Sequence, residues 1–377
     1  MKFLHLADLH LGKRVNGFDM LEDQRFILDQ ILTLCDKHGA EAVVLAGDIY
    51  DTPVPPAAAC TLLDWFLTQL ATRKIPVLAV SGNHDSAERL DFASGLLAEQ
   101  GVYIAGRFTG APRQVVLHDR HGAIEFTLLP FVRAATVRHY LPDADITDYD
   151  SAVGAALAVC EPAAPRRVLV AHQMVVSGVC PPQLSGSETA PLTVGTVDSV
   201  DAAHFAGFNY TALGHIHRAQ RVGSDTVRYA GAPLCYHLDE CGMEKSATLV
   251  RLGRRGVDGI DTLPLHPRRA MRHIVGPLAK LVEHPTDTED YIWATLTDPT
   301  PLPDAMAQLR AAYPNAMRLD YQPQGAAALP ADMTQAVRGK PFAELFQDFF
   351  TKMNGRPLTT EEVLAVKKLR EEASKIE

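Results

Sequence analysis

The sequence predicts a layered α/β fold, and two patterns along the chain support this prediction. Short runs rich in Val and Leu, such as residues 43–46 and 77–80, alternate with longer stretches whose apolar residues recur at helical spacing. The short runs are apolar at every position, which is typical of strands in a sheet that is covered on both faces. We therefore predict an α/β sandwich as the main body, with strands near residues 126–129 and 227–230 adding antiparallel pieces.

Two long helices are predicted near the start of the chain. Residues 20–38 carry one apolar stripe, and Gly39 is placed to end that helix in the left-handed conformation. Pro56 can open a second helix that runs through residue 70, because proline is well tolerated in the first turn.

The length of 377 residues predicts two or three domains, and the patterns along the chain favour three parts. Residues 1–268 form the α/β body. Residues 269–330 form a small α+β unit, with strands at 291–296 and 317–321, a helix at 305–313, and a closing segment rich in Pro, Gly and Ala. Residues 331–377 form a helical tail.

The tail carries six apolar residues that fall on one face of a helix. They are Phe342, Leu345, Phe346, Phe349, Phe350 and Met353. A break at residues 354–357 precedes a capping box, Thr359 with Glu362, that starts a second helix. Such an apolar face is too large to leave in water, so it packs on its own domain or binds a partner.

Composition excludes several classes of protein. The net charge of −9 argues against a protein that coats nucleic acid, although it allows a local basic groove. The apolar run at the start is interrupted by His5 and stopped by Asp8, and no stretch approaches the ~20 apolar residues of a membrane span. We expect a cytoplasmic protein without a membrane segment. None of the six cysteines forms a Cys-x-x-Cys pair, so we expect buried free thiols.

The most informative residues are polar side chains that directly follow five predicted strands. They are Asp8 and His10, Asp48, Asn83 with His84, His172, and His215 with His217. We expect these strand ends to meet at one edge of a sheet. Carboxylates mixed with imidazoles suit Mn, Fe or Zn better than Ca or Mg. The set exceeds the needs of one ion, which predicts two divalent ions, a recurring device for hydrolysing phosphate esters.

Residues 82–85, Gly-Asn-His-Asp, carry the strongest single motif. The amide oxygen of Asn83 can bind a metal without adding charge, and His84 can protonate a phosphate ester. Asp85 can orient that imidazole or hold its proton. Any one motif could be a polar turn, but five motifs in succession after strands favour a metal centre.

These motifs resemble those of the calcineurin-like metallophosphoesterases. Residues 47–52, 212–220 and 239–242 are most similar to the SbcD family of nuclease subunits. The resemblance implies a Mn-dependent DNA exonuclease and endonuclease for double-strand ends and hairpins. It also implies an SbcC-like SMC-type ATPase partner, a homodimer within a heterotetramer, and a role in DNA repair, recombination and replication. Residues 1–268 would be the nuclease domain, 269–330 a capping domain that faces DNA, and 331–377 the partner-binding tail.

The resemblance also implies how the ligands are shared. One ion would be held by Asp8, His10, Asp48 and His217, and the other by Asp48, Asn83, His172 and His215, with Asp48 bridging. His84 would act on the phosphate and not as a ligand. Four basic residues beside the motifs can pair with DNA phosphates or simply be solvated, namely Lys13, Arg14, Arg89 and Arg218.

Two other functions remain open at this point. A phosphoesterase for small phosphodiesters or phosphoproteins would use the same ligands, but it needs neither the second unit nor the apolar tail. An architectural subunit that tethers DNA ends would not need His84.

Overall fold

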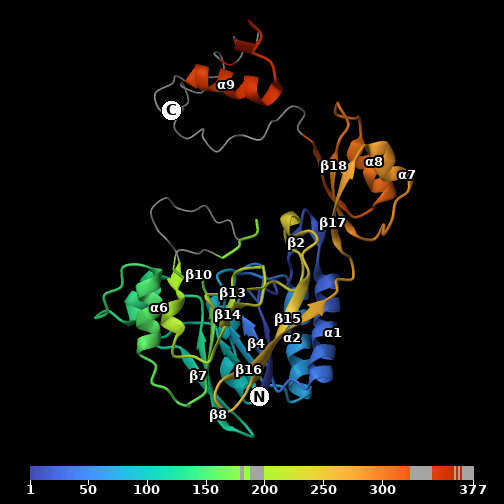
Figure 1. The fold of residues 1–377 in the computed structure, drawn as a ribbon. Helices are drawn as coiled ribbons and strands as arrows, with labels where there is room; N and C mark the ends of the chain where they lie inside the picture. Colours follow the sequence, from blue (N-terminus) through green and yellow to red (C-terminus); the bar gives the residue numbers. More distant parts are fainter. Residues whose placement is uncertain (179–181, 187–198, 323–341, 361, 364–365, 367–377) are drawn as a thin grey trace. The chain divides into compact units, whose positions relative to one another are not determined.

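We analysed a computed structural model of the chain, which describes residues 1–178, 182–186, 199–322, 342–360, 362–363 and 366 (Figure 1). The chain divides into two units. The first comprises Met1–His273 with Asp287–Trp293, and the second comprises Ile274–Thr286 with Ala294–Glu377.

The first unit contains two six-stranded sheets. The first sheet has the order β16-β15-β1-β4-β5-β6. Its strands are β1 (Lys2–Leu6), β4 (Ala42–Ala46), β5 (Val77–Val80), β6 (Val102–Ala105), β15 (Lys245–Leu252) and β16 (Val257–Leu265). The neighbours from β1 to β6 are parallel, whereas β15 is antiparallel to β1.

The second sheet has the order β13-β14-β12-β9-β8-β7. Its strands are β7 (Arg113–Asp119), β8 (Gly122–Leu129), β9 (Arg167–His172), β12 (Tyr210–Gly214), β13 (Gln220–Val222) and β14 (Ser224–Tyr229). The prediction of antiparallel pieces here is only half right. Strand β8 is antiparallel to β7 but parallel to β9, and β14 is antiparallel to β13 but parallel to β12.

The two sheets face each other across one apolar core. Phe3, Val44 and Leu78 of the first sheet are fully buried in the same cluster as Phe126 and Val168 of the second. A second cluster lies on the other face of the second sheet, where β-strand residues pack with α5 (Ala134–Tyr140) and α6 (Tyr149–Ala158). The predicted α/β sandwich is therefore confirmed, and burial on both faces explains why the strands are apolar throughout.

The two long helices also form as predicted. Helix α1 (Leu21–His38) ends at Gly39, which has a φ of 63°, and α2 (Ala57–Thr72) begins directly after Pro56. Figure 1 shows α1 and α2 on one side of the first unit and α6 on the other.

The remaining elements of the first unit are short. They are β2 (Arg14–Val15), β3 (Phe18–Asp19), α3 (Ala87–Asp91), α4 (Ser94–Ala98), β10 (Val175–Val176), β11 (Val200–Asp201) and the 3₁₀ turns η1 (Ala202–Phe205) and η2 (Leu238–Glu240).

The small α+β segment predicted after residue 268 is present. Strands β17 (Met271–Gly276), β18 (Tyr291–Leu296) and β19 (Ala316–Tyr321) form a sheet in that order, with α7 (Leu278–Glu283) and α8 (Ala305–Ala312). In the tail, α9 (Phe342–Asn354) forms where the apolar stripe predicts a helix. The Thr359–Glu362 capping box forms in both directions, but most of the second predicted helix lies outside the described residues.

Two predictions about the whole chain can be compared with the described residues. The five described cysteines are free thiols. Only Cys35 is buried, whereas Cys60 is exposed and the other three are partly exposed, so the prediction of buried thiols is wrong for most of them. Cys180 lies outside the described residues. Among the described helices, none is both long enough and apolar enough to cross a membrane.

A buried ion pair between Asp119 and Arg166 gives a test of the fold. Arg166 donates to both carboxylate oxygens of Asp119 at 2.6 and 3.0 Å, and it also donates to the carbonyl of Gly253, beyond the end of β15. Removing one partner of a buried pair is costly, so we expect Asp119→Asn to lower the free energy of unfolding by about 3 kcal/mol at neutral pH. Denaturant unfolding of the metal-free protein measures this loss.

The pH dependence of that effect has a defined direction. The hydrogen bonds from Arg166 hold the pKa of Asp119 below its ordinary value of 3.8 in the folded protein. The stabilisation is therefore complete above that value and is lost as the pH falls below it. Asp36→Asn, which breaks an exposed pair with Arg73, is the control and should cost under about 1 kcal/mol. A difference between wild type and Asp119→Asn that does not shrink in acid would contradict this interpretation.

Candidate active site

The seven predicted metal ligands come together in the first unit, but at the edges of two sheets. Strands β1, β4 and β5 of the first sheet lead to Asp8, Asp48 and Asn83. Strands β9 and β12 of the second sheet lead to His172 and His215. The expectation of one sheet edge is therefore wrong. Apolar periodicity locates strand ends but does not say which sheet a strand joins.

Backbone strain concentrates at these residues. Positive φ angles occur at Asp8 (53°), His10 (44°), Asp48 (46°) and His215 (100°), a region that residues other than glycine seldom adopt. Gly47, before Asp48, has a φ of 85°, and a side chain there would collide with the ring of His172. Strain of this kind persists where surrounding contacts fix it, and it clusters at functional sites.

One half of the centre is formed by Asp8, His10 and His217, all buried. The Nε2 atoms of His10 and His217 face each other at 3.1 Å. Oδ1 of Asp8 accepts a hydrogen bond from the backbone of His215, whereas its Oδ2 is buried and meets no hydrogen-bond donor among the described residues. A buried carboxylate oxygen and two converging imidazoles are what a divalent cation requires.

The other half is formed by Asn83, His172 and His215. The amide oxygen of Asn83 lies 3.0 Å from His172 Nε2 and 3.0 Å from His215 Nδ1. Nδ1 of His172 is 2.9 Å from the carbonyl oxygen of Ala46, which can only accept, so Nδ1 carries the proton and Nε2 is left for a metal.

Asp48 lies between the two halves. Its Oδ2 is 3.6 Å from His10 Nε2 in the first half and 3.3 Å from His172 Nε2 in the second. Its Oδ1 accepts from the backbone of His84. One carboxylate oxygen within reach of both halves is the arrangement that a bridging ligand needs.

Burial and mutual charge shift the pKa values of these groups strongly. Burial raises the pKa of Asp8 to about 6 and lowers that of His10 to about 4. Burial and the charge of His172 lower the pKa of His215 to about 3. Burial opposes ionisation of Asp48 and His172, but their mutual attraction holds the pKa of Asp48 below its usual range and raises that of His172 to about 9. Perturbation on this scale is typical of a functional centre.

His84 lies beside the metal ligands but is held differently. Its Nδ1 donates to the carbonyl of Asp51 at 2.9 Å, and its ring is perpendicular to that of His10, with centroids 4.9 Å apart. With Nδ1 held on a carbonyl, Nε2 is the ring nitrogen that is left to contact another group.

The role predicted for Asp85 is wrong. Its carboxylate accepts from the backbone N–H groups of Ile49, Tyr50 and Gly82 and does not contact the imidazole of His84. Asp and Asn side chains in turns commonly bond nearby backbone, and that preference prevails here. Asp85 therefore stabilises the loops that carry Asp48 and Asn83, while Asp51 orients His84.

Three residues near the centre escaped the sequence analysis. Asp51 lies 3.3 Å from Nδ1 of His10 and is within 2.7 Å of Lys13. Glu240 and Lys245, both buried, lie behind His217. Asp51 and Glu240 belong to the motifs at 47–52 and 239–242, but neither follows a strand in the pattern that marked the ligands.

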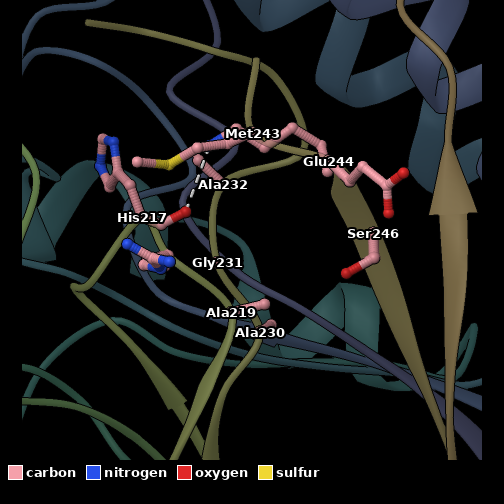
Figure 2. A pocket seen from close by; sticks show the side chains of 10 residues that line it. His217, Ala219, Ala230, Gly231, Ala232, Met243, Glu244 and Ser246 are labelled. Carbon is pink, nitrogen blue, oxygen red and sulfur yellow. Dashed lines mark hydrogen bonds between the residues drawn. The ribbon is translucent and has the colours of Figure 1, made fainter. Parts of the chain in front are cut away.

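The four predicted DNA contacts differ in exposure. Arg14, Arg89 and Arg218 are exposed. Lys13 is only partly exposed and pairs with Asp51, so it is less available than expected. Arg218 borders a cavity of about 140 Å³ next to His217, lined also by Ala219, Gly231, Ala232, Met243, Glu244 and Lys245 (Figure 2).

On α9, Phe349 is exposed and Phe346 and Phe350 are half-buried. Arg356 lies over the ring of Phe350. The side chains of Phe342, Leu345 and Met353, also predicted to bind a partner, lie outside the described residues.

The fold and this centre define the chain as a metal-dependent phosphoesterase. The family model for calcineurin-like phosphoesterases matches residues 1–218, and a model described as a Type 5 capsule protein repressor C-terminal domain matches residues 267–354. The chain is 31% identical over 326 residues to the SbcD subunit of the SbcCD nuclease of Staphylococcus epidermidis, a match that covers 85% of each chain. It belongs to the SbcD family of calcineurin-like phosphoesterases.

Three solved structures also match the chain. TT1561 of Thermus thermophilus is 14% identical, with a TM-score of 0.40, and covers 70% of this chain and 99% of its own. A dimetal phosphatase from Danio rerio is 13% identical, with a TM-score of 0.36, and covers 71% and 99%. The phosphoesterase Yfce from E. coli is 14% identical, with a TM-score of 0.29, and covers 70% and 100%.

Proposed function

We propose that this chain is the nuclease subunit of a DNA-processing complex and that it hydrolyses phosphodiester bonds with two divalent metal ions, Mn²⁺ in preference. The observation that supports the proposal is the convergence of the seven proposed ligand side chains, with Asp48 between the two halves of the centre. His84, held by Asp51 next to that centre, gives the proposed acid for the leaving oxygen.

In the proposed mechanism, Asp8, His10, Asp48 and His217 would hold one ion, and Asp48, Asn83, His172 and His215 would hold the other. When bound, the pair would supply Lewis-acid stabilisation of the phosphate charge and would lower the pKa of the attacking water. Ala46 fixes the ring of His172 so that Nε2 faces the centre. Asp51 holds the Nδ1–H of His84, so that the imidazolium form would donate its Nε2 proton to the departing oxygen and become the neutral ring.

We propose that DNA reaches the centre over a surface that bears Arg14, Arg89 and Arg218. Their exposure and their places next to the ligand-bearing loops support this role. The chain is acidic overall, so steering of DNA would depend on these local charges and would weaken with salt.

We also propose the assembly implied by the family, a homodimer bound to two SMC-type ATPase subunits. In the first unit, Phe92 is 80% exposed and Leu96 is 76% exposed, four residues apart. We propose that these two exposed apolar side chains belong to that interface. The domain roles follow the same scheme, with nuclease (1–268), DNA-facing cap (269–330) and partner-binding tail (331–377).

Removing the metals should abolish hydrolysis, because no described protein group near the centre can replace two cations at the phosphate. After chelation and dialysis we expect activity on a DNA hairpin to return with Mn²⁺ and to return less with Mg²⁺, since imidazole ligands favour the softer ion. Metal analysis should find two equivalents per chain. Full activity in the chelated protein would contradict the proposal.

The choice of substrate separates the proposal from its alternatives. The Mn²⁺-loaded protein, with and without its ATPase, is offered a DNA hairpin, a mononucleotide ester and a phosphopeptide. We expect cleavage of DNA and weaker hydrolysis of the ester. Preference for the phosphopeptide would favour a protein phosphatase, and two bound ions without any hydrolysis would favour an architectural subunit.

The tail should be needed for assembly and not for chemistry, because all proposed ligands precede residue 218. We expect Phe346→Asp with Phe349→Asp to prevent co-purification with the SMC-type ATPase and to leave ester hydrolysis unchanged. The control is Gln347→Asp with Thr351→Asp, which adds the same charge to exposed positions of α9. Wild-type co-purification of the Phe double variant would contradict this role, and its unfolding would show that the stripe packs on its own domain.

A further inference from the structure

We propose that Glu240 is a positioning residue that aims the imidazole of His217 at the metal and that Lys245 holds Glu240 in place. The inference rests on the proposed function, in which His217 is a ligand. The motif at residues 239–242 contains neither a proposed ligand nor the proposed proton donor. The inference gives Glu240 of that motif a role.

The two ring nitrogens of His217 face opposite partners. Nε2 faces the centre, 3.1 Å from Nε2 of His10. Nδ1 faces Oε1 of Glu240 at 3.4 Å. A carboxylate on Nδ1 keeps the proton on that nitrogen and leaves the lone pair of Nε2 for the ion, and such outer partners also raise the basicity of the ligand.

Lys245 contacts both Glu240 and the main chain of His217. Its ammonium contacts Oε2 of Glu240 and also donates to the backbone carbonyl of His217 at 3.2 Å. The same carbonyl accepts from the backbone of Ala232 at 3.1 Å, a bond drawn in Figure 2. His217 is thus held at its ring by Glu240 and at its main chain by Lys245 and Ala232.

Burial makes this support rigid. Glu240 is 0% exposed and Lys245 is 7% exposed, so water cannot easily replace either partner. A buried ion pair is by itself weak support for stability. Its placement directly behind a metal-facing imidazole points to an orienting role.

The imidazole of His10, which faces that of His217, is supported in a similar way by side chains that are more exposed. Asp51 lies 3.3 Å from Nδ1 of His10 and pairs with Lys13. These two side chains are 20% and 18% exposed. Two His residues that share one metal position therefore each have a carboxylate behind them and a lysine beyond it. The repetition supports orientation of ligands as the purpose of the Glu240–Lys245 pair.

The test uses double variants, because removing Glu240 alone would leave a buried ammonium without its carboxylate. Glu240→Leu with Lys245→Met removes both the orienting group and its partner. Glu240→Gln with Lys245→Met keeps an oxygen that can accept from Nδ1. Calorimetric titration with Mn²⁺ should show one of the two sites weakened by about 10–100-fold in the Leu variant and by less than about 10-fold in the Gln variant.

Glu125→Gln is the matched control. Glu125 is also 0% exposed and also pairs with a cation, Arg167, but it lies at the opposite end of the strands from His172. It should lower thermal stability and leave both Mn²⁺ sites intact. Equal weakening of metal binding in this control, or two wild-type sites in the Leu variant, would overturn the inference while the proposed function stands. Wild-type protein that binds no Mn²⁺ would overturn both.

A second measurement does not depend on the folding of any variant at Glu240 or Lys245. Side-chain ¹⁵N spectra of the metal-free protein, labelled at histidine and assigned with His217→Gln, report which nitrogen of His217 carries the proton. The inference expects the neutral ring with the proton on Nδ1. A neutral ring protonated on Nε2 would overturn it.

Discussion

Replacing His84 with Gln is expected to lower the turnover of DNA by about 10²–10⁴-fold, the usual contribution of a general acid, while both metal ions and DNA remain bound. The reason lies in how His84 is held. Its Nδ1 donates to the carbonyl of Asp51 and its backbone N–H donates to Asp48, so the ring needs no metal to keep its place. Single-turnover cleavage, metal analysis and DNA-binding titrations on one preparation measure the three quantities separately.

A matched control separates loss of the acid from a general effect of the substitution. His118→Gln makes the same chemical change at an exposed position of β7 and should cleave DNA at the wild-type rate. Near-normal cleavage by His84→Gln would exclude the acid role. Loss of one metal equivalent would instead make His84 a ligand, a result that the cluster of His10, Asp51 and His84 makes worth testing directly.

The sequence could locate the seven proposed ligands because each one lies at or just after the end of a strand. Short apolar runs locate strand ends, and residues such as Asp48 and Asn83 come within three positions of β4 and β5. The parallel strands of each sheet then bring those ends to one edge, whatever the detailed packing. The α/β sandwich, its two long N-terminal helices and α9 follow from the same periodicity.

The periodicity of apolar residues could not predict contacts between residues that are distant in the chain. The pairing of Asp85 with three backbone amides, and of Glu240 with His217, depends on how loops fold over the sheet edges. The division of the strand ends between two sheets depends on which strands pair, and strong apolarity is common to all of them. These arrangements leave no periodic mark in the sequence.

The other large effect is expected at Asp48, whose replacement by Asn should weaken both metal sites. Oδ2 of Asp48 is the oxygen within 3.6 Å of both His10 and His172, one imidazole from each half. Asn keeps the shape but removes the negative charge that both ions would share. Removing a group that only supports a metal ligand lowers metal affinity by about 10–100-fold. Removing the charge of a ligand itself should lower the affinity for Mn²⁺ by more than about 100-fold at each site.

The control for this variant is another buried aspartate with a cationic partner. Asp23 is 0% exposed, and its carboxylate pairs with Arg269 and Tyr291 and not with a proposed ligand. Asp23→Asn should lower the melting temperature and retain two equivalents of Mn²⁺, whereas Asp48→Asn should lose both in the same titration. Loss of only one equivalent in Asp48→Asn would show that this carboxylate belongs to a single ion. Asp8 would then be the better candidate for the shared ligand, because its buried Oδ2 meets no hydrogen-bond donor among the described residues.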